Sequence, residues 1–294
     1  MTIAGAAVES IALFGTTFQN PIILAAGTAG FGRELAETID LESLGGIVSK
    51  AVSVDPRAGN RSPRVGEFPG GMINSIGLAN PGLAQVADAE LPWLIRNLER
   101  ARFFVNVVGF TEDEYARVVA GLDSLGGMAG YELNLSCPNT SAGGIEFGAD
   151  PAAVSRIVAG CRAVTRRPLL AKLSPALPDI PGMAAAAVDA GADGITLVNT
   201  MPGLIYEGGH PRLGNGNGGV SGPALLPIGL LAVSRVRRRL PETPIIGLGG
   251  VRTVEHVHQY LGAGANLVGV GTAALADPRL PERLARSWHR PRAA

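Results

Sequence analysis

Short runs rich in valine, isoleucine and leucine alternate along the chain with longer stretches in which alanine, leucine and charged residues are mixed. Apolar runs of this length predict buried strands, and the longer mixed stretches predict helices. The predicted strands are residues 22–26, 46–50, 103–107, 131–136, 169–173, 194–198, 244–248 and 267–271. The predicted helices between them include residues 112–122, 151–165, 181–190, 225–239 and 254–263.

Eight strand–helix units in about 250 residues are typical of one α/β architecture, the (β/α)8 TIM barrel, and we expect a single domain. A doubly wound sheet would need a G-x-G-x-x-G turn after an early strand, and the sequence has none there. Weak alternation over residues 8–18 predicts an N-terminal hairpin, at about residues 3–18, that covers the bottom of the barrel. Two long connections, 51–82 and 201–222, are rich in glycine, proline and asparagine, and loops of this length usually carry function.

Composition and charge narrow the class of protein. Of the 294 residues, 46% are hydrophobic and 17% are charged, which excludes a disordered chain. Basic and acidic residues number 25 each, so no net charge attracts nucleic acid or an anionic membrane. Two cysteines make no disulfide framework, which favours a reducing compartment, and no secretory leader or apolar span of about 20 residues is recognisable. We therefore expect a soluble cytoplasmic protein, and the four scattered histidines predict no metal site.

The active site of such a barrel lies at the carboxyl ends of its strands. The chain has only two lysines, Lys50 and Lys172, and both fall at predicted strand ends. Since arginine replaces lysine everywhere else and the two are not interchangeable in a tight site, we favour a functional role over ordinary salt bridges. Other polar groups at strand ends are Thr28, Asn106, Asn134, Ser136, Asn199 and Thr200.

The turns after the seventh and eighth strands are rich in glycine. Gly249 and Gly250 follow one strand, and Gly271 and Thr272 follow the other. Loops at these two places commonly bind phosphate through backbone N–H groups, and residues 218–222 could complete the cradle. The alternative is that these glycines only turn the chain.

Cys137 lies just past the fourth strand, where its thiol would face the site. An unperturbed thiol, with a pKa of about 8.5, suits proton abstraction near neutral pH. The alternative, a small buried hydrophobe, fits Cys161 in its helical run better. Asparagines at the same rim would recognise a ring with alternating N–H and C=O groups, although asparagine is also common in turns. They are Asn74, Asn106, Asn134, Asn139 and Asn199.

Taken together, the motifs resemble those of the dihydroorotate dehydrogenases, flavoproteins of pyrimidine synthesis that bind FMN in a barrel. The resemblance extends from Asn20 to Ala274, and ELNLSCPN with NSIGLANPG is its most specific part. The remaining motifs are NPIILAAGTAGFG, IVSKAVS, PRAGNRSPR, VNVVG, AKLSP, GITLVNT, GGVSGPALLPI, IIGLGGV and LVGVGTA.

The resemblance also implies a subclass. Cysteine at 137 is similar to class 1, because the membrane-associated class 2 enzymes have serine there. The sequence GGIEFG after it resembles class 1B more than the homodimeric, fumarate-using class 1A. Class 1B enzymes pair this subunit with a second one that holds FAD and an iron–sulfur cluster and passes electrons to NAD. This chain has no cysteine cluster for such a group, so that partner would be another chain. We also expect a homodimer.

Carried over by position, the resemblance implies three sets of residues. The FMN contacts are Ala26, Lys50, Ala51, Asn106, Asn134, Lys172, Val198, Gly222, Gly249, Gly250, Gly271 and Thr272. The substrate contacts are Lys50, Asn74, Ser75, Ile76, Gly77, Leu78, Asn134, Asn139, Asn199 and Thr200. The catalytic residues are Cys137, Lys50 and Lys172. The family often has serine at the position of Ala26, so a hydroxyl contact to the flavin is replaced here by a backbone contact at most.

The implied reaction is oxidation of dihydroorotate. Cys137 removes the C5 proton, hydride passes from C6 to flavin N5, Lys172 lies near N1 and the C2 carbonyl, and Lys50 bridges flavin and substrate. Three alternatives stay open at this point. They are a flavoenzyme acting on another dihydropyrimidine, a Schiff-base aldolase using either lysine, and a catalytically silent flavin-binding subunit. The sequence leaves the electron acceptor open between NAD, fumarate and quinone.

Overall fold

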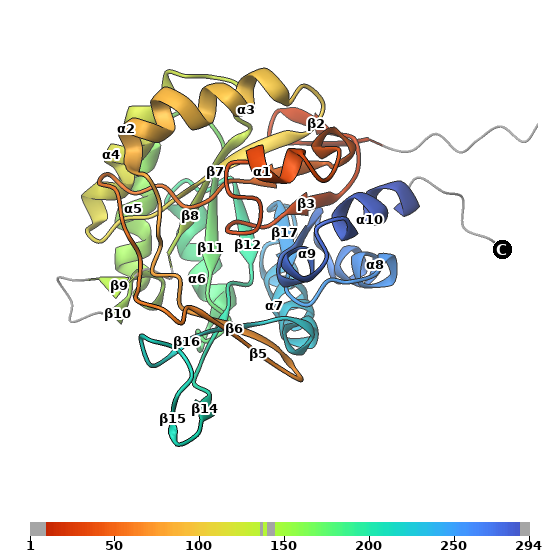
Figure 1. Cartoon of the computed structure of the whole chain (residues 1–294). Helices are drawn as coiled ribbons and strands as arrows, with labels where there is room; N and C mark the ends of the chain where they lie inside the picture. The colour runs from red at the N-terminus through yellow and green to blue at the C-terminus, as the bar shows by residue number, and fades with distance from the viewer. Residues whose placement is uncertain (1–9, 136–137, 140–144, 289–294) are drawn as a thin grey trace, which may run out of the picture.

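The structure is a computed structural model that describes residues 10–135, 138–139 and 145–288. Its centre is a closed barrel of eight parallel strands wrapped by helices, which confirms the predicted (β/α)8 fold (Figure 1). In barrel order the strands are β3 (Ile22–Leu24), β4 (Gly46–Val48), β7 (Arg102–Val107), β8 (Gly130–Asn134), β11 (Leu169–Leu173), β12 (Gly194–Leu197), β17 (Ile245–Leu248) and β18 (Leu267–Val270). Several end one or two residues before the predicted limit, because the chain leaves the ladder where the polar rim begins.

Helices follow the strands, close to the predicted ranges. The longer ones are α4 (Glu112–Asp123), α5 (Pro151–Val164), α6 (Ile180–Asp189), α7 (Leu226–Arg239), α8 (Val254–Ala263) and α10 (Leu280–Trp288). Shorter ones are α1 (Arg33–Ala36), α2 (Gly82–Gln85), α3 (Leu91–Asn97), α9 (Thr272–Ala276), the π-helix η2 (Val86–Glu90), and the 3-10 turns η1 (Leu41–Ser43), η4 (Phe147–Ala149) and η5 (Pro223–Leu225). Side-chain caps start three of the longer helices, at Asp150, Asp179 and Thr253, where each oxygen accepts a bond from a first-turn N–H.

The hydrophobic core has two layers, because successive strand residues face opposite sides of the barrel wall. Outward-facing residues pack against the helices in one large cluster. Inward-facing residues form a second, smaller cluster inside the barrel, of Phe18, Ile23, Val48, Phe104, Leu170, Ile246 and Leu267. Tyr131 on β8 points outward, since its hydroxyl meets Val119 and Asp123 of α4. Glu132, the next residue, therefore faces the interior.

An antiparallel hairpin, β1 (Ile11–Leu13) and β2 (Thr16–Phe18), lies across the amino ends of the barrel strands. Its two-residue turn has positive φ at Phe14 (54°) and Gly15 (71°). The Phe14 ring packs edge-on against Phe104, 5.7 Å between centroids, and a Cβ on Gly194 would lie 3.0 Å from it. Arg102 Nε, at the start of β7, donates to Thr17 O at 3.0 Å. The hairpin thus closes the interior cluster from below.

The two long connections pair with each other at the opposite end. They form an antiparallel sheet in the order β13 (Met201–Gly203), β16 (Gly218–Ser221), β6 (Gly71–Asn74) and β5 (Val65–Phe68). The ribbon β14 (Tyr206–Glu207) and β15 (His210–Pro211) projects beyond it (Figure 1). A short pair, β9 (Pro138–Asn139) and β10 (Ile145–Glu146), flanks the same rim after β8. Within the described residues, no helix combines the length and apolarity that crossing a bilayer requires.

Candidate active site at the carboxyl end of the barrel

Parallel strand register brings the predicted polar residues to one end of the barrel. Lys172 lies level with Asn134 on β8 and with Thr196 on β12. Asn199 Nδ2 donates to Asn134 Oδ1 at 3.1 Å, and the Thr200 amide donates to Asn199 Oδ1 at 2.8 Å. Asn134, Asn199 and Thr200 therefore form one hydrogen-bonded row, all half-buried.

A charged cluster lies inside the barrel below this row. Lys172 Nζ is 3.5 Å from Glu132 Oε1, and these side chains are only 6% and 1% exposed. Asn106 Nδ2, on β7, donates to the same Glu132 oxygen at 2.7 Å. Glu132 was not among the predicted site residues. The signal was present, since strand alternation places Glu132 on the same face as Asn134.

Three buried oxygens around this cluster lack a hydrogen-bond partner within the described part of the chain: Asn106 Oδ1, Glu132 Oε2 and Thr196 Oγ1. Leaving a buried polar atom unpaired costs about 1–3 kcal/mol. Such atoms at the ligand end of a barrel fit a bound polar group that completes them. The FMN ring, with its N–H and carbonyl edge, is a group of this kind.

The glycine turns after β17 and β18 lie beside each other, because these strands are neighbours in the barrel. Gly249 and Gly250 have φ of 126° and 72°, and a Cβ on Gly250 would lie 2.7 Å from Leu226 N. Tyr260 of α8 donates its hydroxyl to Gly249 O at 2.8 Å and so fixes the turn from behind. The contact between Tyr260 and this turn arises from tertiary packing, and the sequence did not predict it. A close-approaching backbone of this kind fits a phosphate.

The other cofactor candidates lie around the same opening. Lys50 follows β4 and is half-buried, and its amide donates to Gly30 O at 2.8 Å. Gly222, with φ of 110°, directly follows β16. The remaining candidates lie within three residues of the ends of barrel strands: Ala26, Ala51, Val198, Gly271 and Thr272.

The predicted substrate segment, Asn74 to Leu78, leaves β6 toward the asparagine row. Asn74 Nδ2 donates to Gly219 O at 3.3 Å, and a Cβ on Gly219 would fall 2.1 Å from Thr200 Oγ1. Ser75 Oγ accepts a 2.7 Å bond from Asn60, and Gly77 and Leu78 have φ of 73° and 57°. Ile76 is 36% exposed. Contacts through Gly219 thus link Asn74 with Thr200.

Of the two cysteines, Cys161 belongs to the described residues. Cys137 lies outside the described residues, and Asn139 pairs through its backbone with Ile145. Cys161 is fully buried on α5, and burial raises the pKa of its thiol to about 12. Its environment is that of a core hydrophobe, as predicted. Among the described residues, no three histidine, cysteine, aspartate or glutamate side chains gather in a way that could hold a metal.

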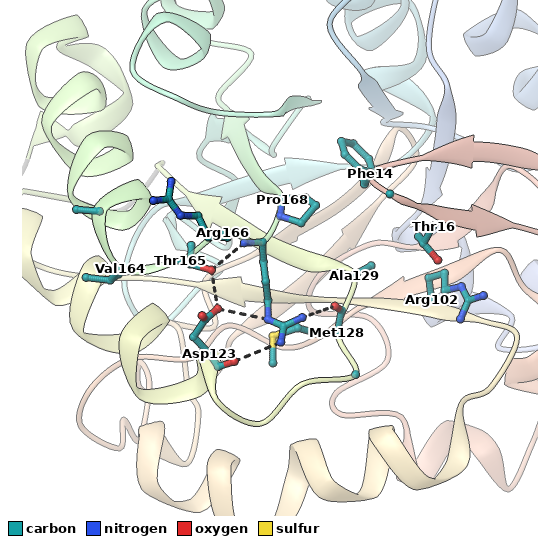
Figure 2. A pocket seen from close by; sticks show the side chains of 14 residues that line it. Phe14, Thr16, Arg102, Asp123, Met128, Ala129, Val164, Thr165, Arg166 and Pro168 are labelled. Atoms are coloured by element: carbon teal, nitrogen blue, oxygen red, sulfur yellow. Dashed lines mark hydrogen bonds and ion pairs between the residues drawn. The ribbon is translucent and has the colours of Figure 1, made fainter.

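A cavity of about 660 Å³ lies at the other end of the barrel, beside the hairpin turn (Figure 2). Arg167 lines it and forms an ion pair with Asp123, with Nε 3.3 Å from Asp123 Oδ1. The Arg167 guanidinium also donates to Met128 O at 3.4 Å and to Asp123 O at 3.3 Å, while Thr165 Oγ1 donates to Asp123 Oδ1 at 2.5 Å. None of the predicted site residues lines this cavity.

Comparison with known proteins gives one consistent answer. A family model described as dihydroorotate dehydrogenase matches residues 9–289. A dihydroorotate dehydrogenase B (NAD(+)) catalytic subunit from Pelobacter propionicus is 42% identical over 96% of this chain and 92% of its own length. A protein of the same name from Desulforudis audaxviator is 45% identical over 92% and 87%. A relative from Solibacter usitatus, provisionally named dihydroorotate dehydrogenase A (fumarate), is 44% identical over 92% and 89%.

Proposed function

Because the chain belongs to the dihydroorotate dehydrogenase family, we propose that it oxidises dihydroorotate to orotate with bound FMN, as a step of pyrimidine synthesis. The observation that carries this proposal is the buried lysine of the barrel interior. Lys172 is held beside orphaned acceptors at the carboxyl end, directly below a row of amides suited to a pyrimidine ring. The donor set, the glycine turns and the orphaned oxygens all fit FMN.

When bound, FMN supplies the acceptor for the hydride that leaves dihydroorotate. The ammonium of Lys172 would stabilise negative charge on the reduced ring, and Lys50 would contact both cofactor and substrate. The backbone N–H groups at the β17 and β18 turns would hold the phosphate, helped by Thr272 and the turn at Gly222. The remaining residues that would hold the cofactor are Ala26, Ala51, Asn106, Asn134 and Val198.

The substrate is oriented by amide side chains. Asn74, Asn134, Asn139 and Asn199 each offer a donor and an acceptor to the pyrimidine ring and its carboxylate, with Thr200 and residues 75–78 completing the contact. The Cys137 thiolate removes the proton at C5. Holding the ring flat by its edges leaves one face open to the flavin.

We further propose that electrons leave through a second subunit that holds FAD and an iron–sulfur cluster and reduces NAD. The names of the Pelobacter and Desulforudis relatives, which specify NAD and a catalytic subunit, support this acceptor. The Solibacter relative, named for fumarate, supplies the alternative. Adding NAD with a partner subunit, or fumarate alone, to the reduced protein distinguishes the two. We propose a homodimer of this chain as the core of the assembly.

The proposal is tested by mixing the FMN-loaded protein anaerobically with dihydroorotate and following the loss of flavin absorbance. We expect rapid bleaching, slowed by about 100-fold or more in Cys137→Ala because the base is gone. Cys161→Ala is the matched control and should reduce at the wild-type rate. Unchanged reduction in Cys137→Ala would refute the role of Cys137.

Two further outcomes would refute the reaction itself. A protein that stays colourless after incubation with FMN does not use this cofactor, and a lysine adduct trapped by borohydride would then favour the aldolase. Faster bleaching by dihydrouracil than by dihydroorotate would indicate a different dihydropyrimidine as substrate.

A further inference from the structure

The carboxylate of Glu132 is the least expected group in the barrel interior. It is 1% exposed, and the interior cluster of the barrel is apolar, including Leu170, its register partner on β11, with Phe104 and Ile246. Its described partners are Lys172 Nζ at 3.5 Å and Asn106 Nδ2 at 2.7 Å, both through Oε1. Glu132 is on neither the substrate row nor the glycine turns.

Stability alone does not account for this ion pair. Removing two charges from water costs several kcal/mol each, and replacing a buried pair with apolar residues is often neutral or stabilising. The surrounding layer shows that this barrel can be filled with hydrophobic side chains. A buried carboxylate next to the one lysine of the interior is thus better explained by what it does to that lysine.

The hydrogen bonds of this cluster are incomplete among the described residues. Lys172 carries three N–H donors and has a single carboxylate contact in the described structure. Glu132 Oε2 and Asn106 Oδ1 have no partner among the described residues. Glu132 thus anchors the ammonium from below and leaves its remaining donors for a group above.

We propose that Glu132 is a positioning residue that fixes the ammonium of Lys172 against the bound flavin and, by its negative charge, sets the flavin's redox potential. This inference rests on the proposed function only in that FMN occupies the carboxyl end. A bare ammonium would favour the anionic reduced flavin strongly. The adjacent carboxylate offsets part of that charge and makes the flavin a weaker oxidant, so that it gives up its electrons more readily to the next acceptor.

The proposal predicts how the midpoint potentials of four variants compare with that of wild type. Glu132→Gln keeps an acceptor for Lys172 and loses the negative charge, so the ratio of reduced to oxidised flavin should rise about tenfold at a given potential, a midpoint shift of about 30 mV upward. Lys172→Gln should give the lowest potential. The double variant should lie above Lys172→Gln, because it lacks the unpaired carboxylate. Glu132→Asp keeps the charge and should stay close to wild type.

The measurement is anaerobic reduction of the FMN-loaded proteins in the presence of a reference dye of known potential. If Glu132 only fills space, Glu132→Gln matches wild type and the double variant matches Lys172→Gln, and the proposal is overturned. If Glu132→Gln fails to fold or to hold flavin, the midpoint potentials of Lys172→Gln and the double variant are compared instead. A higher potential in the double variant supports the proposal, and equal potentials overturn it. Bleaching of the wild type by dihydroorotate is scored separately, so failure of the proposed function and failure of this inference remain distinguishable.

Discussion

The two ends of the barrel differ in a way that identifies the ligand end. The amino end has the cavity of about 660 Å³, where Arg167 forms an ion pair with Asp123, although its buried Nε makes no hydrogen bond, and Arg102 donates to Thr17 O and Glu99 O. The carboxyl end has a buried ion pair and three buried oxygens without a partner in the described residues. Open space alone does not mark a binding site. Several unpaired buried oxygens gathered around one buried ion pair mark it more reliably, because leaving them all unpaired is costly unless a ligand completes them.

The two ends also differ in the space around glycines of the same backbone conformation. Gly250, at the carboxyl end, and Gly126, in the loop before β8, have nearly equal φ, 72° and 75°. A Cβ on Gly250 would lie 2.7 Å from Leu226 N, whereas one on Gly126 meets no described atom within 4 Å. An alanine would therefore strain the backbone about equally at both positions. Only at Gly250 would its methyl group also collide with a neighbouring backbone atom.

The largest effect that we predict is the loss of FMN affinity in Gly250→Ala. The new methyl group should displace the turn proposed to bind phosphate and weaken FMN binding by about 100-fold, or about 2.7 kcal/mol. Gly126→Ala should lower the unfolding free energy by about 1 kcal/mol from its positive φ and leave FMN affinity unchanged. Titration of the apo-proteins with FMN, followed by flavin fluorescence, measures both. Equal affinities would mean that the glycine turn does not contact the cofactor.

The second prediction concerns Phe14, which closes the barrel at the amino end. Phe14→Ala removes the ring that packs on Phe104 and should lower the unfolding free energy by about 2–3 kcal/mol. Phe14→Gly should be about 1 kcal/mol more stable than Phe14→Ala, because φ is 54° and glycine relieves that strain. Urea unfolding measures both. A Phe14→Gly protein less stable than Phe14→Ala would show that the turn is not strained. A lowered FMN affinity in either variant would contradict the assignment of cofactor binding to the carboxyl end alone.

Much of the fold could be predicted because the barrel strands are specified locally. The predicted ranges 169–173 and 267–271 match β11 and β18 within one residue, and Lys172, one residue before the end of β11, and Thr272, two residues past β18, lie at the predicted rim. Lys172 could be placed because it falls at a predicted strand end and is one of only two lysines in the chain. The roles assigned to these residues by resemblance stay predictions.

The remainder depends on contacts between distant segments. The connections 51–82 and 201–222 were expected to be functional loops, and their pairing as β6 and β16 needs a register that neither segment specifies alone. Tyr260 reaches Gly249 only once α8 packs against β17. Glu132 is different, since alternation alone could have placed it inside the barrel. It was overlooked because the strand was interpreted by its apolar residues and its final asparagine.

A smaller effect is expected at the cavity of the amino end. Arg167→Met removes the guanidinium that joins Asp123 to Met128 and should lower the unfolding free energy by about 1.5 kcal/mol. The neighbouring Arg166→Met is the matched control, because Arg166 is exposed and lines the same cavity; it should change stability by less than about 0.5 kcal/mol. Neither should alter FMN affinity. If both weakened FMN binding, the cavity would have to be part of the cofactor site.

The smallest effect concerns the pH dependence of the scaffold. Burial raises the pKa of Cys161 from its usual 9.0 to about 12, and burial also raises the pKa of Tyr131 and of Tyr260. Above pH 9 the thiol of the unfolded chain releases a proton that the folded protein retains. The unfolding free energy is therefore undiminished by this group below pH 9 and falls as the pH rises toward 12. Between pH 8 and pH 10, wild type should lose about 1 kcal/mol more than Cys161→Ala in urea unfolding. Parallel losses in the two proteins would show that the Cys161 thiol ionises as freely in the folded state as in the unfolded chain, and hence that α5 does not exclude water from it.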